Sequence, residues 1–190
     1  MRNRCLTILT LLAITGFLVS CVTAKGVTVQ DRRDYALKMK NETLAKLYAH
    51  KPETRDMIKK AAGYGVFSNI GVYVFLLAGG NGYGVVVDNS TGQKTYMKVR
   101  SVGLGMGIGI KDMRAVFIFR NKRVLTDFVE KGWEFGGQAD AAAKSGDQGG
   151  AAGGEAYIET DIIIYQLTEA GVALQATIAG TKYWKDEDLN

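Results

Sequence analysis

The chain has 190 residues, of which 24 are Lys or Arg and 19 are Asp or Glu, and 47% are hydrophobic. This length suits one domain with a substantial core, and the apolar content excludes an intrinsically disordered protein. The sequence has no dense basic run, so no nucleic-acid partner is expected. Its 24 glycines accompany a single proline, so they belong to the fold and not to a Pro/Gly-rich disordered tract.

The first 20 residues have the pattern of an export signal. Arg2 and Arg4 precede a mostly apolar run over residues 5–19, which is short for a membrane-spanning helix of ~20 residues. The run ends at Leu18-Val19-Ser20-Cys21, which is typical of a bacterial lipobox. We therefore expect residues 1–20 to be a lipoprotein signal peptide. An ordinary secretory signal cut nearby and an uncleaved anchor are the alternatives.

Cys21 is expected to be the lipidated first residue of the mature chain. Cys5 would leave with the signal peptide, so no free thiol and no disulfide would remain. Dual acylation holds a protein stably at a bilayer, which makes the membrane the first expected partner. Val22 follows the cysteine where Asp would favour retention at the inner membrane, so we expect a lipid-anchored protein of the outer membrane that faces the periplasm.

Two helices are predicted at the start of the body. Residues 21–30 are expected to be a tether, and residues 31–190 to be one domain. From Asp31 onward, apolar residues recur at helical spacing. These residues are Leu37, Leu44, Leu47 and Tyr48. Pro52 in a first turn and Gly63 just past an end indicate a second, short helix.

Basic residues are concentrated beside the predicted anchor. Residues 21–60 hold 10 Lys or Arg against 5 Asp or Glu. Each basic residue near an anionic membrane surface can contribute roughly 1 kcal/mol of binding. The candidate phospholipid-binding residues are Lys38, Lys40, Lys46, Arg55, Lys59 and Lys60. A solvated helix face is the alternative interpretation of the same residues.

After Tyr64 the apolar pattern becomes typical of strands. Strands are predicted over 72–78, 83–88, 94–99, 102–110, 115–119, 133–139, 156–166 and 172–179. A turn is expected at 88–92, an amphipathic helix over 121–131 that ends at Gly132, and a glycine-rich loop at 145–154. The fold class is α+β, with N-terminal helices packed on a Gly-rich, mainly antiparallel, strongly curved sheet or partial barrel.

One predicted strand has glycine at every second position. Gly103, Gly105, Gly107 and Gly109 alternate with apolar residues, so one face of the strand would be bare backbone. Because glycine inside a strand costs about 0.5 to 1 kcal/mol, a close approach should compensate for it. Internal packing is the favoured explanation, and a ligand against the glycine face is the alternative.

The patterns of familiar catalytic sites are absent. The run at 79–84 is not a dinucleotide fingerprint, because Val85 stands where a third glycine is required. His50 is the only histidine, so a zinc site or a Ser/His/Asp triad would depend on one imidazole. The carboxylates at 186–188 are expected to form a solvated acidic end and not a calcium site. We expect no enzyme activity, no cofactor and no metal.

Several blocks of the body follow one another in a characteristic order. They are Ala61-Ala62-Gly63-Tyr64-Gly65-Val66-Phe67, the glycine-rich run 79–84 with Val85-Val86-Val87, residues 101–112, and residues 164–180. Together these blocks resemble the SYLF domain, also called the Ysc84 domain, over most of residues 35–190. Ser68 departs from the pattern, because family members often have proline there.

The resemblance implies a membrane-associated function. Eukaryotic members of the family are associated with phosphoinositide membranes and, in yeast, with actin, whereas bacterial members commonly occur on exported proteins and lipoproteins. Actin is irrelevant to a bacterial envelope. We expect a non-enzymatic envelope protein that binds anionic phospholipid or a lipid-like ligand. The alternative is a scaffold for an envelope protein or the cell-wall polymer, with Tyr157, Tyr183 or Trp184 as contacts.

Overall fold

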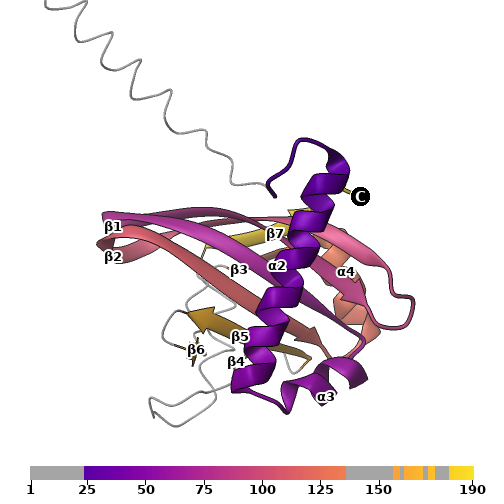
Figure 1. Cartoon of the computed structure of the whole chain (residues 1–190). Coiled ribbons are helices and arrows are strands. Elements are labelled where there is room, and N and C mark those ends of the chain that lie inside the picture. Colours follow the sequence, from indigo (N-terminus) through magenta and orange to yellow (C-terminus); the bar gives the residue numbers. More distant parts are fainter. Residues whose placement is uncertain (1–23, 136–155, 159–160, 169–170, 174–179) are drawn as a thin grey trace, which may run out of the picture.

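A computed structural model describes residues 24–135, 156–158, 161–168, 171–173 and 180–190 (Figure 1). In chain order its elements are α2 (Val29–His50), α3 (Thr54–Lys60), β1 (Gly63–Asp88), β2 (Lys94–Phe119), α4 (Lys122–Lys131), β3 (Trp133–Phe135), β4 (Ala156–Ile158), β5 (Ile162–Thr168), β6 (Gly171–Ala173) and β7 (Thr181–Lys185). The predicted signal peptide, Cys21 and the predicted loop at 145–154 lie outside the described residues.

The predicted helices are confirmed, with small shifts at their ends. Thr28 caps α2, because its hydroxyl accepts from the Asp31 backbone N–H at 3.0 Å while the Asp31 carboxylate accepts from the Thr28 N–H at 2.9 Å. Asp31 is therefore the third residue of the first turn and not the start. Asn121 caps α4 at the Val124 N–H (2.9 Å), and Gly132 follows its last residue with φ of 73°.

Two strands of 26 residues each dominate the sheet. β1 and β2 pair antiparallel from Gly63↔Phe119 to Val87↔Lys94, with one register shift between Phe75 and Leu77. The prediction of five separate strands over this stretch was wrong, because glycines and polar residues that indicated breaks are accommodated inside continuous strands. The turn predicted at 88–92 is confirmed and contains Gly92 with φ of 72°.

β2 organises the remaining strands. Its second half pairs with β5 (Arg114↔Leu167) and its first half with β7 (Met97↔Lys185), so both halves of β2 carry a further strand (Figure 1). β4 and β5 form a hairpin where one strand was predicted over 156–166. β7 was not predicted. The fold class is confirmed: N-terminal helices pack on an antiparallel seven-stranded sheet that curls into a half-barrel.

Close packing explains three glycines of β1. A Cβ atom added at Gly80 would lie 2.6 Å from Asn69 Oδ1, and one at Gly84 would lie 2.6 Å from the Val66 carbonyl oxygen. One at Gly82 would collide with the Ser68 carbonyl oxygen. The glycine-rich run therefore lets the second half of β1 approach the first half. The surroundings of the glycine row at 103–109 lie outside the described side chains, so that packing prediction stays a prediction.

The sheet buries a separate core on each face. Under α2 and α3 the core includes Leu47, Ile58, Val66, Val116 and Tyr165. On the opposite face α4 covers an aromatic core, in which the ring centroids of Phe67 and Tyr183 lie 4.8 Å apart and those of Phe119 and Phe128 lie 4.9 Å apart. Apolar residues on both faces of one sheet explain why its strands show little clean alternation.

The segment after β7 closes the sheet edge. Asp186 is buried, and its carboxylate lies 2.9 Å from Lys98 Nζ, while the Asp188 carboxylate lies 3.0 Å from the same nitrogen. The Asn190 side chain accepts from the Tyr96 N–H at 2.9 Å and donates to the Tyr96 carbonyl at 2.8 Å. The expectation of a wholly solvated acidic end was therefore wrong for Asp186.

Candidate functional site

The six basic residues singled out in the sequence lie on three different surfaces. Lys38 and Lys46 are exposed on α2, where Asp34, Lys38, Glu42 and Lys46 follow one another at spacing four with alternating charge. Residues at this spacing lie on one helix face, so this part of α2 presents both signs to solvent.

Lys40 lies on another side of α2 and is partly buried. Two residues correspond to about 200° of helical rotation, so Lys40 and Lys38 point in nearly opposite directions. Burial and the nearby charge of Lys94 lower the pKa of Lys40. Lys40 therefore contributes positive charge beside the β1–β2 turn and not to the outer face of α2.

The other three residues, Arg55, Lys59 and Lys60, lie near Arg120, and we call these four residues the basic corner. Arg55, Lys59 and Lys60 are exposed on α3, and the described residues place none of the three in an ion pair. The Arg55 guanidinium lies 4.6 Å from the centroid of the Tyr48 ring, a cation–π distance. Lys60 and Arg120 line a pocket of about 370 Å³ whose other walls are Met57, Ala61, Ile118 and Ile163.

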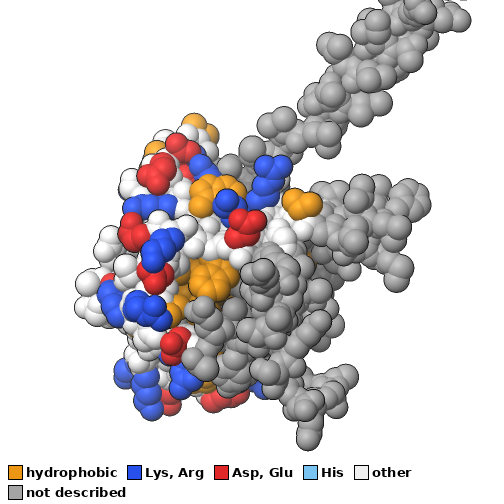
Figure 2. Space-filling view, turned by 180° about the vertical axis from the view of Figure 1, so that it is seen from behind, with side chains coloured by type: hydrophobic (Ala, Val, Ile, Leu, Met, Phe, Trp, Pro, Cys, Tyr) orange, Lys and Arg blue, Asp and Glu red, His pale blue; other side chains and the backbone are white. Residues whose placement is uncertain are grey.

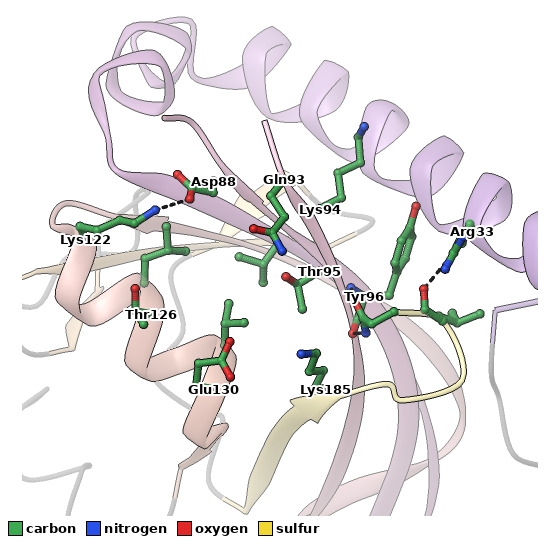
Figure 3. Close-up of a pocket in the computed structure, with 15 residues that line it drawn as sticks. Arg33, Asp88, Gln93, Lys94, Thr95, Tyr96, Lys122, Thr126, Glu130 and Lys185 are labelled. Carbon is green, nitrogen blue, oxygen red and sulfur yellow. Dashed lines mark hydrogen bonds and ion pairs between the residues drawn. The ribbon is translucent and has the colours of Figure 1, made fainter. Parts of the chain in front are cut away.

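A larger pocket, of about 630 Å³, lies between α4, the β1–β2 turn and the end of β7 (Figure 3). We call it the hairpin groove. It is lined by Arg33, Val86, Asp88, Gln93, Lys94, Thr95, Tyr96, Lys122, Leu125, Thr126, Val129, Glu130, Lys185, Leu189 and Asn190. The lining combines four aliphatic side chains with four cations and two carboxylates, so it is both apolar and net positive.

Internal contacts already engage some of the charges in the groove. Lys122 forms an ion pair with Asp88, and this contact together with the Ser90 hydroxyl holds the pKa of Asp88 well below its usual range. Arg33 Nε donates to the Leu189 carbonyl at 2.8 Å. For Lys94, Glu130 and Lys185, no ion pair occurs within the residues that the structure describes.

Sequence reasoning missed the groove because its residues come from five separate segments. Lys94, Lys122 and Lys185 are isolated in the sequence, and no spacing rule connects them. The only usable signal was the face of α4, where Lys122, Thr126 and Glu130 recur at spacing four. Lys94, Lys122 and Lys185 come together only because β2 pairs with β7.

The structure also places three other residues that the sequence analysis discussed. Tyr183, considered as a partner contact, is only 3% exposed and belongs to the aromatic core. Ser68 donates its hydroxyl to the Asp112 carboxylate at 2.9 Å, while His50 is exposed at the last residue of α2. Across the described residues, no His, Cys, Asp and Glu cluster could hold a metal ion, and no helix is long and apolar enough to span a bilayer.

Comparison with known proteins identifies the domain. Residues 100–190 match the model of the Ysc84 family, described as "Las17-binding protein actin regulator". The chain is 35% identical over 164 residues to beta cell expansion factor A of Aeromonas veronii, an alignment that covers 85% of this chain and 60% of that protein. The chain thus spans less than two thirds of this relative. The predicted resemblance to the Ysc84 (SYLF) family is therefore confirmed.

Proposed function

We propose that this chain is a non-enzymatic, lipid-anchored protein of the bacterial outer membrane whose Ysc84 domain binds anionic phospholipid from the periplasmic side. The basic corner is the observation that supports this function best. Two of its cations, Lys60 and Arg120, line a pocket with apolar walls, and Arg55 and Lys59 are exposed on the same short helix, an arrangement that suits an anionic head group and the start of an acyl chain. The outer face of α2 carries both positive and negative side chains, so it suits the binding of an anionic phospholipid less well than the basic corner does.

The position of α2 restricts how an anchored domain could reach the membrane. α2 has 22 residues and is therefore about 33 Å long, with the tether at its start and the basic corner beyond its end. Charges interact with a membrane only within about 8 Å at physiological ionic strength. An anchor at Cys21 and the basic corner therefore contact one bilayer together most directly when α2 lies along its surface.

The face opposite to that of Figure 1 favours membrane contact less. Figure 2 shows that face, where Lys and Arg side chains are interspersed with Asp and Glu side chains over the part that is not grey. Interspersed charges produce no extended field of one sign, so attraction to an anionic bilayer is weak there. This contrast directs the experiment to the basic corner.

Flotation with liposomes tests the proposed binding surface. The chain without the predicted signal peptide (residues 1–20) and with Cys21→Ala would be mixed with phosphatidylglycerol vesicles and with neutral phosphatidylcholine vesicles. We expect flotation with the anionic vesicles only. The triple change of Arg55, Lys59 and Lys60 to Gln should reduce the apparent partition coefficient roughly 100-fold, at ~1 kcal/mol for each cation.

The matched control removes three positive charges elsewhere. Arg123, Lys131 and Lys182 are exposed on α4 and β7, and changing them to Gln alters the net charge equally. This control should keep most of the flotation. Equal losses in both triple variants would show that net charge, and not the basic corner, causes binding.

The anchor needs its own experiment. Labelling of cells with a palmitate analogue should modify the wild-type chain and not Cys21→Ala, and only the wild type should fractionate with outer membranes. Crosslinking in intact cells tests the scaffold alternative. A protein partner that persists after delipidation, in a chain that does not float with vesicles, would favour that alternative over phospholipid binding.

A further inference from the structure

The hairpin groove combines an apolar floor with a charged wall. Val86, Leu125 and Leu189 are buried, and Val129 is partly buried beside them on α4. The Thr95 side chain stands at the base of the groove, and its polar neighbours come from the strand end and the segment after β7. Apolar and polar surfaces therefore meet inside one pocket of about 630 Å³, as in sites that hold amphiphilic small molecules.

Lys185 is the cation placed to meet a ligand there. It is the last residue of β7 and is partly buried, and Figure 3 shows its side chain pointing across the groove toward α4. Lys122 is engaged by Asp88, and Arg33 by the Leu189 carbonyl, so their contacts leave Lys185 as the charge directed into the groove. Lys94 adds positive charge from the side of α2, where it already lowers the pKa of Lys40.

We propose that the hairpin groove binds a single-chain amphiphile with an anionic head group, either a carboxylate or a phosphate monoester. Lys185 pairs with the head group, and the alkyl chain lies on the floor formed by Val86, Leu125, Val129 and Leu189. Glu130 lies on the opposite wall, and its negative charge reduces the affinity for the anionic head group. This inference goes beyond the proposed function, because it concerns one dissolved molecule in a different site and requires no membrane surface.

Calorimetric titration of the chain without the predicted signal peptide (residues 1–20) and with Cys21→Ala tests the chemical class. Octyl phosphate and octanoate should both bind, whereas inorganic phosphate, acetate and octyl glucoside should bind at least tenfold more weakly, because each lacks the chain or the charge. Along butyl, hexyl and octyl phosphate, affinity should rise by up to roughly fourfold for each methylene that reaches the floor. An affinity for octyl glucoside equal to that for octyl phosphate would overturn the role of the anionic head group. An affinity for inorganic phosphate equal to that for octyl phosphate would overturn the role of the apolar floor.

Variants of the two walls test the assignment of residues. Lys185→Gln should weaken octyl phosphate binding roughly tenfold or more, whereas the control Lys182→Gln, on the same strand but outside the groove, should change it less than twofold. Glu130→Gln should strengthen binding by roughly threefold, since it removes a nearby negative charge. Val129→Thr should weaken octyl phosphate and leave butyl phosphate almost unchanged.

Each of these results can contradict the proposal separately from the membrane experiment. Weaker binding of octyl phosphate in Glu130→Gln would mean that Glu130 supports the bound state and does not repel the head group, which would overturn the placement of the head group between Lys185 and Glu130. Unchanged binding in Lys185→Gln would overturn the site. Vesicle flotation that depends on Arg55, Lys59 and Lys60 would survive either outcome, because those residues lie outside the groove.

Discussion

The basic corner and the hairpin groove both place cations beside apolar side chains, yet they are assembled in opposite ways. Three of the four basic residues of the corner come from α3, a helix of seven residues. The lining of the groove runs from Arg33 on α2 to Asn190 after β7. A short local segment can therefore carry the charge of the corner, whereas the groove exists only when the whole sheet has closed.

One side chain joins the two sites. Asn89, in the turn between β1 and β2, donates from Nδ2 to the Ile58 carbonyl at 2.6 Å and to the Ala61 carbonyl at 3.0 Å. Its backbone N–H donates to the Ala62 carbonyl at 3.0 Å. The turn beside the groove thus satisfies carbonyl groups at the end of α3, which would otherwise lack partners.

The largest effect should come from the core that supports the groove. Phe128 of α4 is fully buried, with its ring centroid 4.9 Å from that of Phe119 and 5.7 Å from that of Tyr183. Phe128→Ala should lower the free energy of unfolding by about 3 to 5 kcal/mol, and the melting temperature by roughly 2 to 4 °C for each kcal/mol. Thermal denaturation measures both.

The same variant separates the two sites functionally. Because α4 forms one wall of the groove, Phe128→Ala should bind octyl phosphate more weakly at a temperature where it is still folded. Vesicle flotation through the basic corner should remain close to wild type. A parallel loss of both activities would contradict the independence of the two sites.

The next largest effect concerns the two halves of β1. Gly82→Ala brings a Cβ atom against the Ser68 carbonyl and within 2.8 Å of Asn69 Cα, and should destabilise the protein by about 1 to 3 kcal/mol. Gly79→Ala is the matched control, because a Cβ atom there meets nothing within 4 Å. Chemical denaturation compares the two, and equal stability would show that the halves of β1 can separate without cost.

The glycine row of β2 gives a related prediction. Gly105→Val and Gly107→Val should lower the melting temperature and the amount of protein in cells, while lipidation at Cys21 is unaffected. The cost should be about 1 to 3 kcal/mol for each site if the row is packed. A variant with wild-type stability but no lipid association would show instead that the glycine face binds a ligand.

Asn89→Ala should affect the corner more than the groove. Its loss leaves the Ile58 and Ala61 carbonyls without their side-chain donor, at a cost of about 1 to 2 kcal/mol. Hydrogen exchange should show faster opening of α3 than of α4. Equal protection of α3 in the variant and the wild type would mean that packing of Ile58 alone holds this helix.

The contrast between a corner formed by one local segment and a groove formed by distant segments also explains what could be predicted from the sequence. The three helices were predicted because caps, such as Asn121 with Gly132, and apolar spacing are local signals. The long strands were divided wrongly, since the glycines of β1 indicated breaks until the packing of Gly82 on Ser68 was known. Three of the four residues of the corner were named from the sequence because α3 is local, and Lys185 was missed because only the β2–β7 pairing brings it to α4.

Acid should weaken the groove side of the molecule by a small amount. Lys122 and Ser90 hold the pKa of Asp88 well below its usual range, so below about pH 4 the unfolded chain binds more protons at this site than the folded chain. Stability therefore falls as the pH drops through that range. The Lys122 side chain is 55% exposed, so the contribution should stay below about 1 kcal/mol. Asp88→Asn should flatten the melting temperature between about pH 3 and 5, and an unchanged acid slope would assign the effect to other carboxylates.

The smallest effect tests whether Lys40 belongs with the groove or with the outer face of α2. Burial, and then the charge of Lys94, lower the pKa of Lys40, so near pH 10 the folded chain binds fewer protons there than the unfolded chain, and stability rises with pH. Lys94→Gln should raise the pKa of Lys40 toward its usual value without reaching it, because burial remains. Stability at neutral pH should change by less than about 0.5 kcal/mol. Titration of the lysine side-chain signals by NMR measures the shift, with Lys38→Gln as the control. A shift of Lys40 caused by Lys38→Gln and not by Lys94→Gln would return Lys40 to the face of α2 that the sequence had assigned to the membrane, and would remove one positive charge from the surroundings of the groove.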